Sequence, residues 1–383
     1  MVVRVSRVLA AVFLCCIAAE VLSGVQRPAL SAPAACMPEG KAGLRYVCGA
    51  EHPEDLAHIP GTRWLITSGF SDGAGLKLID TAADTLHRWY TGAPEQVHYD
   101  SQAWPDCPGP PDVARFNAHG IHLHDPQDGR RSLYVVNHGG RESIEIFSVE
   151  THGIADPGLV WKGCIVLPPG MAANSVSVFR DGTILATVLT LPGSTIADFV
   201  RGQNTGVVLQ WRPGDSGFKS LPGTELPGNN GIEVSADDQE FYVVAFGLHA
   251  VYVYSRCNPR HPLRSAVAPG FMPDNIHWDD GQLLLAGMQL DEPACGGLRK
   301  VIDGKADEMR CHRGYAVAAL DPAAMQFKVL AKSGPDPDFN GVSAAAIVNN
   351  ELWLGSWQQP DRVAHRPLPR GPSLKAGARP HAP

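Results

Sequence analysis

The 383-residue sequence contains no Cys-x-x-Cys pair and no Asn-x-Ser/Thr sequence, and each absence excludes one kind of site. Without cysteines at that spacing, neither a zinc ribbon nor a thioredoxin-type redox centre is expected. Without the acceptor sequence, no N-linked glycan is expected. Charged residues make up only 19% of the chain. The net charge of −7 argues against nucleic acid as a partner, because a mildly acidic surface repels phosphates.

The sequence also has no convincing amphipathic helix of ten or more residues after its N-terminal segment. Turn-forming residues are plentiful instead, with 40 glycines and 32 prolines. They predict many turns and therefore many short strands. Hydrophobic residues make up 44% of the chain, which is enough for a folded protein with a large core. The composition favours an all-β chain.

The N-terminal segment has the pattern of an export signal. Arg4 and Arg7 precede an apolar stretch over Val8–Val21, and small residues follow at Ser31–Ala35. We therefore expect residues 1–35 to be a signal peptide with a short linker, and the protein to be exported to the periplasm or the extracellular space. If the segment were not cleaved, it would associate the protein with a membrane.

The cysteine content suits an oxidising compartment, since the chain has nine cysteines. Two of them would leave with the signal, and the remaining seven are an odd number, so at least one has no partner within the chain. The pairs closest in sequence are Cys36 with Cys48 and Cys295 with Cys311. Both pairs flank loop-like segments, and we predict a disulfide in each.

Six segments of the chain align, and each has a polar or small residue two positions before the first apolar residue of a short strand. In most of them a turn and a second apolar strand follow, and further strand-like stretches lie between the segments. Six units of about four strands are the pattern of a six-bladed β-propeller, here over residues 36–360. Hairpins in a sandwich would explain the strands but not six polar residues in phase. Residues 361–383, rich in Pro, Arg and Ala, are expected to form a disordered tail.

The polar position of the repeat suggests a metal site. In chain order it holds Glu54, His119, Asn174, Asn230, Asp274 and Ser343. The innermost strand of every propeller blade lines the central channel, so these side chains should converge there. Buried carboxylates and amides need a partner, and Ca²⁺ takes about six to eight such oxygens. With Asn275 as a further amide, the pattern predicts a channel calcium, although each Asn or Asp taken singly could be a turn residue.

Motifs around two histidines resemble those of the paraoxonase/arylesterase family. Phe116–Ile121 matches the pattern F-N-x-H-G-I, and Tyr134–His138 contains V-V-N-H, followed by the strand Ser143–Phe147. The stretches Asn230–Ile232 and Asp274–Ile276 also resemble that family and the broader gluconolactonase-like and strictosidine-synthase-like propellers. The resemblance covers roughly residues 45–360.

The resemblance implies a six-bladed propeller that hydrolyses lactones and, promiscuously, aryl esters and organophosphates. The residues that match its catalytic calcium ligands are Glu54, Asn174, Asn230, Asp274 and Asn275. A histidine pair matching His119 and His138 is implied to activate water. A second, structural calcium would use Asp55 and the carbonyl of Ile121, but Ser175 replaces its acidic ligand. The resemblance also implies a long-range disulfide from Cys48 or Cys36, for which no partner cysteine occurs near the C-terminus.

The chemistry of these residues fits ester hydrolysis independently of the resemblance. A channel Ca²⁺ can act as a Lewis acid and stabilise the oxyanion of the tetrahedral intermediate. His119, with an ordinary pKa of about 6.5, can take a proton from water at neutral pH. His138 would orient His119, although its position alone suggests a surface histidine at a strand end. The expected partner is a small lactone or ester, and the oligomeric state is left open.

Other interpretations remain open at this point. A gluconolactonase-like sugar lactonase would use the same metal with polar loops around it, and a non-catalytic propeller would hold a structural calcium and bind a partner. A zinc cluster of His119, His122 and His124 is disfavoured, because strand alternation puts His119 on the opposite face from the other two. The Gly69–Gly73 stretch matches G-x-S-x-G, but a second strand at Leu76–Ile79 makes it a hairpin turn rather than a nucleophile elbow.

Overall fold

The computed structural model describes residues 36–368 apart from 127–128, 152, 154 and 307–310. The chain divides into two units, Met1–Ala35 and Cys36–Pro383, and the second contains all the described residues. The expected signal peptide and residues 369–383 of the expected tail lie outside the described residues. No helix in the described ranges is long and apolar enough to span a membrane.

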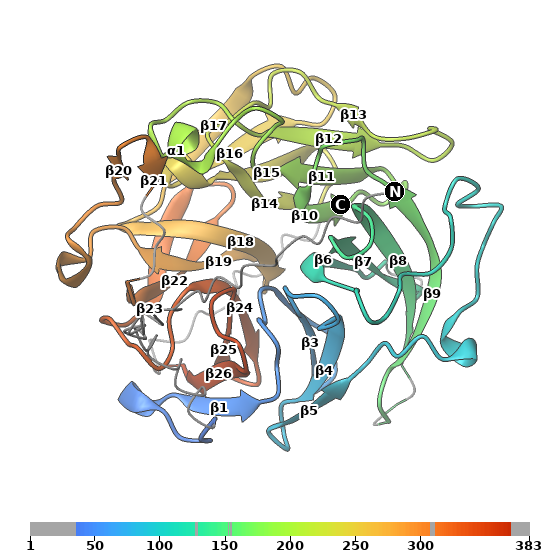
Figure 1. Ribbon diagram of the computed structural model, residues 1–383, viewed down its shortest axis with the longest axis horizontal. Helices are drawn as coiled ribbons and strands as arrows, with labels where there is room; N and C mark the ends of the chain where they lie inside the picture. The colour runs from blue at the N-terminus through green and yellow to red at the C-terminus, as the bar shows by residue number, and fades with distance from the viewer. Residues whose placement is uncertain (1–35, 127–128, 152, 154, 307–310, 369–383) are drawn as a thin grey trace, which may run out of the picture. The chain divides into compact units, whose positions relative to one another are not determined.

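Six four-stranded antiparallel sheets make up the second unit and confirm the predicted all-β, six-bladed β-propeller. Figure 1 shows the sheets arranged around a ring, with β6, β10, β14, β18 and β24 toward its centre. Every sheet is a blade whose strands follow one another outward, and neighbouring blades pack face to face. Between the first two blades, for example, Trp64, Phe116, Phe147 and Trp161 are all buried in one apolar cluster.

The blades have the following bounds. The first is β2 (Leu56–His58), β3 (Trp64–Ser68), β4 (Leu76–Asp80) and β5 (Thr85–Arg88). The second is β6 (Ala118–His124), β7 (Arg131–Asn137), β8 (Ser143–Glu150) and β9 (Gly158–Val166). The third is β10 (Ala173–Val178), β11 (Ile184–Val188), β12 (Val207–Trp211) and β13 (Lys219–Ser220). The fourth is β14 (Asn229–Val234), β15 (Glu240–Ala245), β16 (Ala250–Ser255) and β17 (Pro262–Val267).

The last two blades differ slightly from this pattern. The fifth is β18 (Phe271–Asp279), β19 (Gln282–Gln289), β22 (Tyr315–Asp321) and β23 (Gln326–Lys332), with the hairpin β20 (Val301–Ile302) and β21 (Lys305–Ala306) inserted. The sixth is β24 (Val342–Val348), β25 (Glu351–Ser356), β26 (Arg362–Pro367) and β1 (Arg45–Cys48). Short helices in the loops are η1 (Lys41–Gly43), η2 (Pro94–Gln96), α1 (Ile196–Val200), η3 (Phe246–Leu248) and η4 (Pro293–Cys295).

The sixth blade closes the ring, because its outermost strand comes from the start of the unit. Strand β1 pairs antiparallel with β26, so that Arg45 lies opposite His365 and Cys48 opposite Arg362. The expected disordered tail from residue 361 is therefore wrong for Arg362–Pro367. The composition of the whole tail concealed a six-residue strand whose partner lies at the other end of the unit. Closure uses backbone pairing, and Cys48 is bonded to Cys36 rather than to a distant cysteine.

Tyr46 in β1 offers a test of how much this closure stabilises the fold. Its ring is 5% exposed, lies 5.8 Å from the Phe339 ring and has the Arg362 guanidinium 5.1 Å above it. We expect Tyr46→Ala to lower the free energy of unfolding by about 3–5 kcal/mol, as loss of a buried aromatic ring does, measured by urea denaturation.

Tyr46→Phe is the matched control for that prediction. The Tyr46 hydroxyl is buried without a hydrogen-bond partner in the described part of the chain, so its removal should cost less than about 1 kcal/mol. Equal losses in the two variants would show that the hydroxyl, and not the packing of the ring, matters at this position.

Three disulfides are present, and two of them are the predicted pairs. The bonds join Cys36 to Cys48, Cys295 to Cys311 and Cys107 to Cys164. The third links cysteines 57 residues apart, which proximity in sequence does not reveal. Cys257 is free and exposed, in agreement with the odd count. Three disulfides are typical of proteins that fold in an oxidising, exported environment.

The polar position of each blade coincides with an irregularity in its innermost strand. In the second to fifth blades, pairing with the next strand skips two residues, which begin with His119, Asn174, Asn230 and Asp274 respectively. Such bulges break the alternation of side chains and redirect them. The skipped residues therefore face the channel without disturbing the apolar alternation of the strand that follows.

Candidate active site

The structure places His119 and His138 together at one end of the channel. Strand β6 pairs antiparallel with β7, so that His138 N–H donates to the Asn117 carbonyl at 3.0 Å, and His119 lies two residues further on in the bulge that follows Ala118. His119 Nδ1 lies 2.9 Å from His138 Nε2. Glu142, which no sequence motif singled out, has Oε2 2.7 Å from His138 Nδ1. The only sign of its role in the sequence was its position, because Glu142 lies four residues after His138 in a turn at the end of a strand.

This chain of contacts assigns the protons on both imidazoles. An ionised carboxylate can only accept hydrogen bonds, so His138 carries a proton on Nδ1 and donates it to Glu142. His138 Nε2 then accepts from His119 Nδ1–H, which leaves the lone pair of His119 on Nε2. His119 Nε2 lies 3.6 Å from Glu54 Oε2. The basic nitrogen of His119 is therefore directed at the ring of oxygen-bearing side chains.

The surroundings of His119 keep it neutral. The residue is 8% exposed, and its ring stacks on Phe70 with centroids 4.1 Å apart. Burial, together with the neighbouring His138, holds the pKa of His119 well below its ordinary value. A neutral imidazole at pH 7 is ready to accept a proton. Phe70 comes from the Gly69–Gly73 turn, which leads into β4 and so forms a hairpin turn, as expected.

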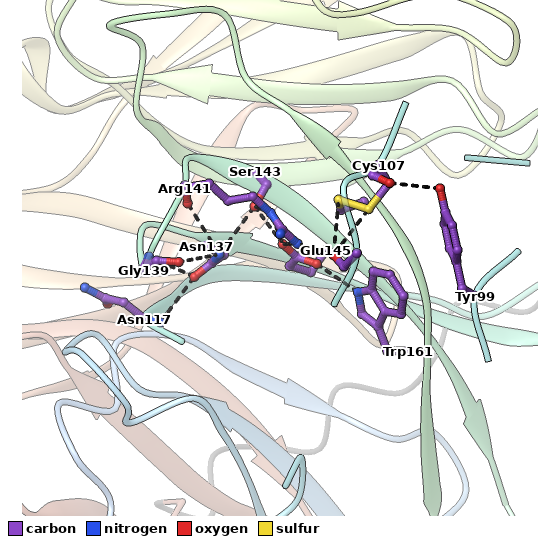
Figure 2. A network of polar contacts seen from close by, with 11 residues as sticks. Tyr99, Cys107, Asn117, Asn137, Gly139, Arg141, Ser143, Glu145 and Trp161 are labelled. Carbon is purple, nitrogen blue, oxygen red and sulfur yellow. Dashed lines mark hydrogen bonds and ion pairs between the residues drawn. A yellow bond between two sulfur atoms is a disulfide. The ribbon is translucent and has the colours of Figure 1, made fainter. Parts of the chain in front are cut away.

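Asn137 fixes the turn that carries His138. Its Oδ1 accepts hydrogen bonds from the backbone N–H of Gly139 at 2.9 Å and of Asn117 at 3.2 Å. Its Nδ2 donates to the Gly139 carbonyl at 3.1 Å. Figure 2 shows this amide between the two segments and the polar network continuing to the buried Glu145. In the V-V-N-H motif, the asparagine thus holds the turn that presents the histidine.

Four buried oxygens in the channel have no hydrogen-bond donor in the described part of the chain. They are Glu54 Oε2, Asn174 Oδ1, Asn230 Oδ1 and Asn275 Oδ1. These residues are between 2% and 8% exposed, and all four were expected to hold calcium. A buried oxygen without a donor costs about 1–3 kcal/mol. Three of these oxygens stand at in-phase positions and the fourth, on Asn275, is next to one, which is the arrangement that an oxygen-binding cation requires.

The two carboxylates of this ring, Glu54 and Asp274, are unfavourable in their ionised form when no cation lies beside them. Burial, reinforced by the charges of Asp55 and Asp274, raises the pKa of Glu54 well above its ordinary value. Burial also raises the pKa of Asp274 to about 7, against the lowering effect of the Asn230 amide. A divalent cation would hold both carboxylates ionised, and their two charges with three amide oxygens suit Ca²⁺.

The composition of the ring sets a limit on the kind of metal. No group of three or more His, Cys, Asp or Glu residues that could hold a metal occurs among the described residues. The zinc cluster of His119, His122 and His124 is therefore not formed. Strand alternation does not separate His119 from the other two histidines, because the bulge at His119 and Gly120 breaks the alternation, and His119 and His122 are both buried. A metal here depends on asparagine oxygens.

Two glycines allow neighbouring blades to approach closely at the ring. A Cβ atom on Gly120 would lie 2.5 Å from the Asn174 carbonyl oxygen, and one on Gly231 would lie 2.5 Å from that of Asp274. Any side chain would push the strand of the next blade outward. The glycines that follow His119 and Asn230 therefore keep the residues of adjacent blades together.

Asp55 and Ile121, expected at a second calcium, meet in a different way. Asp55 Oδ2 accepts from the Ile121 N–H at 2.9 Å, and Oδ1 accepts from the Leu56 N–H at 2.8 Å. His277 Nε2 also lies 2.7 Å from Asp55 Oδ1. Burial lowers the pKa of His277, but Asp55 and Glu233 outweigh it and raise the pKa to about 10. With both oxygens engaged and an imidazolium beside them, this donor set does not fit a second cation.

No protein-family model and no curated protein matches the chain. Among solved structures it is similar to a luciferin-regenerating enzyme, with 13% identity over 84% of this chain and 94% of the other, at a TM-score of 0.46. A PQQ-bound aldose sugar dehydrogenase from Streptomyces coelicolor shows 12% identity over 86% and 99%, at 0.44. A presumed gluconolactonase shows 13% over 86% and 93%, at 0.47. These similarities are too low to bear on activity, and the fold rests on the six sheets.

Proposed function

We propose that the protein is a calcium-dependent hydrolase of lactones and aryl esters, of the kind that its resemblance to the paraoxonase/arylesterase family implies. One observation carries the proposal: the free Nε2 of His119 faces Glu54 in a ring of buried oxygens that lack donors. A neutral base beside an oxygen-rich cation site suits the attack of water on an ester carbonyl.

The calcium would be held by Glu54, Asn174, Asn230, Asp274 and Asn275. Calcium bound there supplies a Lewis acid that polarises the ester carbonyl and balances the negative charge on its oxygen. The chain prepares this site in advance, because Asn275 Nδ2 donates to Glu54 Oε1 at 2.8 Å and so fixes the carboxylate. The asparagine's remaining oxygen is left for the cation.

The histidines move the proton. His119 Nε2 takes a proton from the attacking water, and the positive charge that arises is shared through His138 with the Glu142 carboxylate. His119 then returns the proton to the leaving alkoxide oxygen as the ester C–O bond breaks. Phe70 covers one face of His119 and keeps bulk water from that face. Glu142 is a positioning residue, because it acts only through His138.

Glu142→Gln tests the proton relay. The neutral amide can still accept the His138 N–H but cannot stabilise positive charge, so we expect kcat to fall about tenfold with KM and calcium affinity unchanged. The pH–rate profile should also change, which a purely structural role would not produce. Glu95→Gln, an exposed site in η2, is the control. An unchanged kcat and profile would remove Glu142 from the relay.

A substrate panel tests the function itself. Aliphatic, aromatic and sugar lactones, together with phenyl acetate, are assayed with calcium and with excess chelator. We expect turnover of lactones and aryl esters that chelator abolishes and added calcium restores. A preference for sugar lactones would favour a gluconolactonase-like enzyme, and activity insensitive to chelator would exclude the calcium mechanism. No turnover of any substrate would favour a propeller that binds a partner without catalysis.

The setting of the protein forms part of the same proposal. The three disulfides and the N-terminal signal pattern support export to the periplasm or the extracellular space. The partner we propose is a small lactone or ester.

A further inference from the structure

A second layer of side chains lines the channel three positions beyond the polar ring. Its members are Ala57, His122, Ser177, Glu233, His277 and Ala346. A strand advances about 3.3 Å per residue, and four of the innermost strands bulge at the polar ring, so this layer lies roughly 7–10 Å further along them. It is therefore separate from the candidate active site, although the same six strands carry both.

Small residues in two blades open a cavity in this layer. The second to fifth blades contribute polar side chains, whereas the first and sixth contribute only Ala57 and Ala346. A cavity of about 330 Å³ lies there, lined on one side by these alanines with Ile347. Neither His119 nor Glu54 lines it. The volume falls at the lower end of the range for small-molecule sites.

His122 presents a hydrogen-bond acceptor to the cavity. Ser177 Oγ donates to Glu233 Oε1 at 2.7 Å, so both oxygens are placed to accept from His122 Nδ1–H, at 3.4 and 3.6 Å. The lone pair of His122 is then on Nε2, which has no partner in the described ranges. His122 is 8% exposed and lines this cavity as well as a second one beside Val178 and Arg180, so its Nε2 is open to a ligand.

Asp279 presents a second acceptor. It ends β18 and lines the same cavity, and its carboxylate makes no hydrogen bond or ion pair with another described residue. Burial and the adjacent Asp280 raise its pKa to about 6, so it is ionised at neutral pH.

The other titratable groups of the wall donate nothing to the cavity. His58 uses Nε2–H on the Thr62 carbonyl, and its pKa is lowered by burial. The two nitrogens of His277 face Asp55 and Glu233. The positive charge of His277 is balanced by these two carboxylates, and the rest of the polar wall offers acceptors and, at Asp279 and the exposed Asp280, negative charge.

We propose that this cavity binds a small organic ammonium ion, with its N–H groups toward Asp279 and its apolar part against Ala57, Ala346 and Ile347. The Trp278 ring, which also lines the cavity, suits a cationic ligand. Its indole N–H is held by the Val234 carbonyl at 2.7 Å, so it does not compete as a donor. An inorganic cation would gain nothing from the apolar wall.

Calorimetric titration of the full chain in calcium-containing buffer at pH 7.5 tests the proposal. The probes are 2-phenylethylammonium and its neutral counterpart 2-phenylethanol, which has nearly the same shape. We expect saturable one-to-one binding of the ammonium ion and binding at least tenfold weaker for the alcohol. Asp279→Asn should weaken ammonium binding at least tenfold, and Ala346→Leu, which fills the cavity, should weaken it by a similar or larger factor.

Asp303→Asn is the matched control, since Asp303 is an exposed aspartate in the β20–β21 turn and should leave binding unchanged. The melting temperature of each variant shows that it is folded, and Asp279→Asn serves alone if Ala346→Leu does not fold. Equal binding of alcohol and ammonium ion would overturn the proposed charge recognition. Binding unaffected by Asp279→Asn, or no saturable binding of the ammonium ion at all, would overturn the site.

Discussion

Replacement of His119 by glutamine is expected to lower kcat for lactone hydrolysis by about 10²- to 10⁴-fold, the usual contribution of a general base. The amide keeps much of the volume of the imidazole and can still meet His138, but it cannot take a proton from water. Calcium binding should persist, because the oxygens that lack donors belong to other residues. Steady-state kinetics and calcium titration measure the two effects separately.

His124→Gln is the matched control, because His124 lies on the same strand and belongs neither to the histidine pair nor to the oxygen ring. It should change kcat by less than about twofold, since nothing in the proton relay touches it. If His119→Gln retained most of its activity and His124→Gln lost it, the basic residue would be misassigned. Loss of calcium binding in His119→Gln would instead give this histidine a structural role.

Calcium removal is expected to abolish turnover and to destabilise the fold. A ligand that binds only the native state stabilises it by about 4 kcal/mol at a concentration about 1,000 times its Kd. Chelator should therefore lower the free energy of unfolding by an amount of this order. The physical reason is the return of two buried carboxylates and three amide oxygens to an uncompensated state. Urea denaturation with and without chelator measures the difference.

Glu54→Gln should be at least as stable as the wild type without calcium, and less stable than the wild type with calcium. Without calcium the variant should be at least as stable as the wild type, because it removes a buried carboxylate whose pKa is already raised. Calcium should raise the free energy of unfolding of this variant only slightly, because one of the two charges that balance the ion is lost. Glu39→Gln, a substitution at an exposed site, is the control, and calcium should raise its free energy of unfolding as much as that of the wild type. If calcium stabilised Glu54→Gln as much as it stabilised the wild type, the ion would not be bound at Glu54.

The polar ring could be predicted because each of its members lies at a fixed distance from a strand pattern that repeats along the chain. The residues that flank Asn174 differ from those that flank Asn230, yet each asparagine stands two positions before the first apolar residue of a strand. Their position in a bulge follows from the structure alone. The repeat therefore predicted which side chains occupy equivalent positions, but it did not predict the bulge that turns them toward the channel.

Contacts between distant parts of the chain could not be predicted in this way. The Cys107–Cys164 bond joins a loop to β9, and nothing in either local sequence specifies the partner. Phe70 reaches His119 from a different blade, so its role depends on how two blades pack. The His277 contact with Asp55 likewise crosses between blades, and it changed the interpretation of the expected second calcium site. Patterns along one strand carry no information about such neighbours.

The pairing of β1 with β26 has a consequence for the order in which the molecule folds. Arg45 and His365 are 320 residues apart, and both belong to the same sheet. During synthesis the first five blades can form as they emerge, but the sixth consists of β1 alone until its other three strands, at the end of the unit, are available. Until then β1 has an unpaired edge and the ring is open. Deleting β1 or β26 should therefore produce an open, aggregation-prone protein with its first five blades intact.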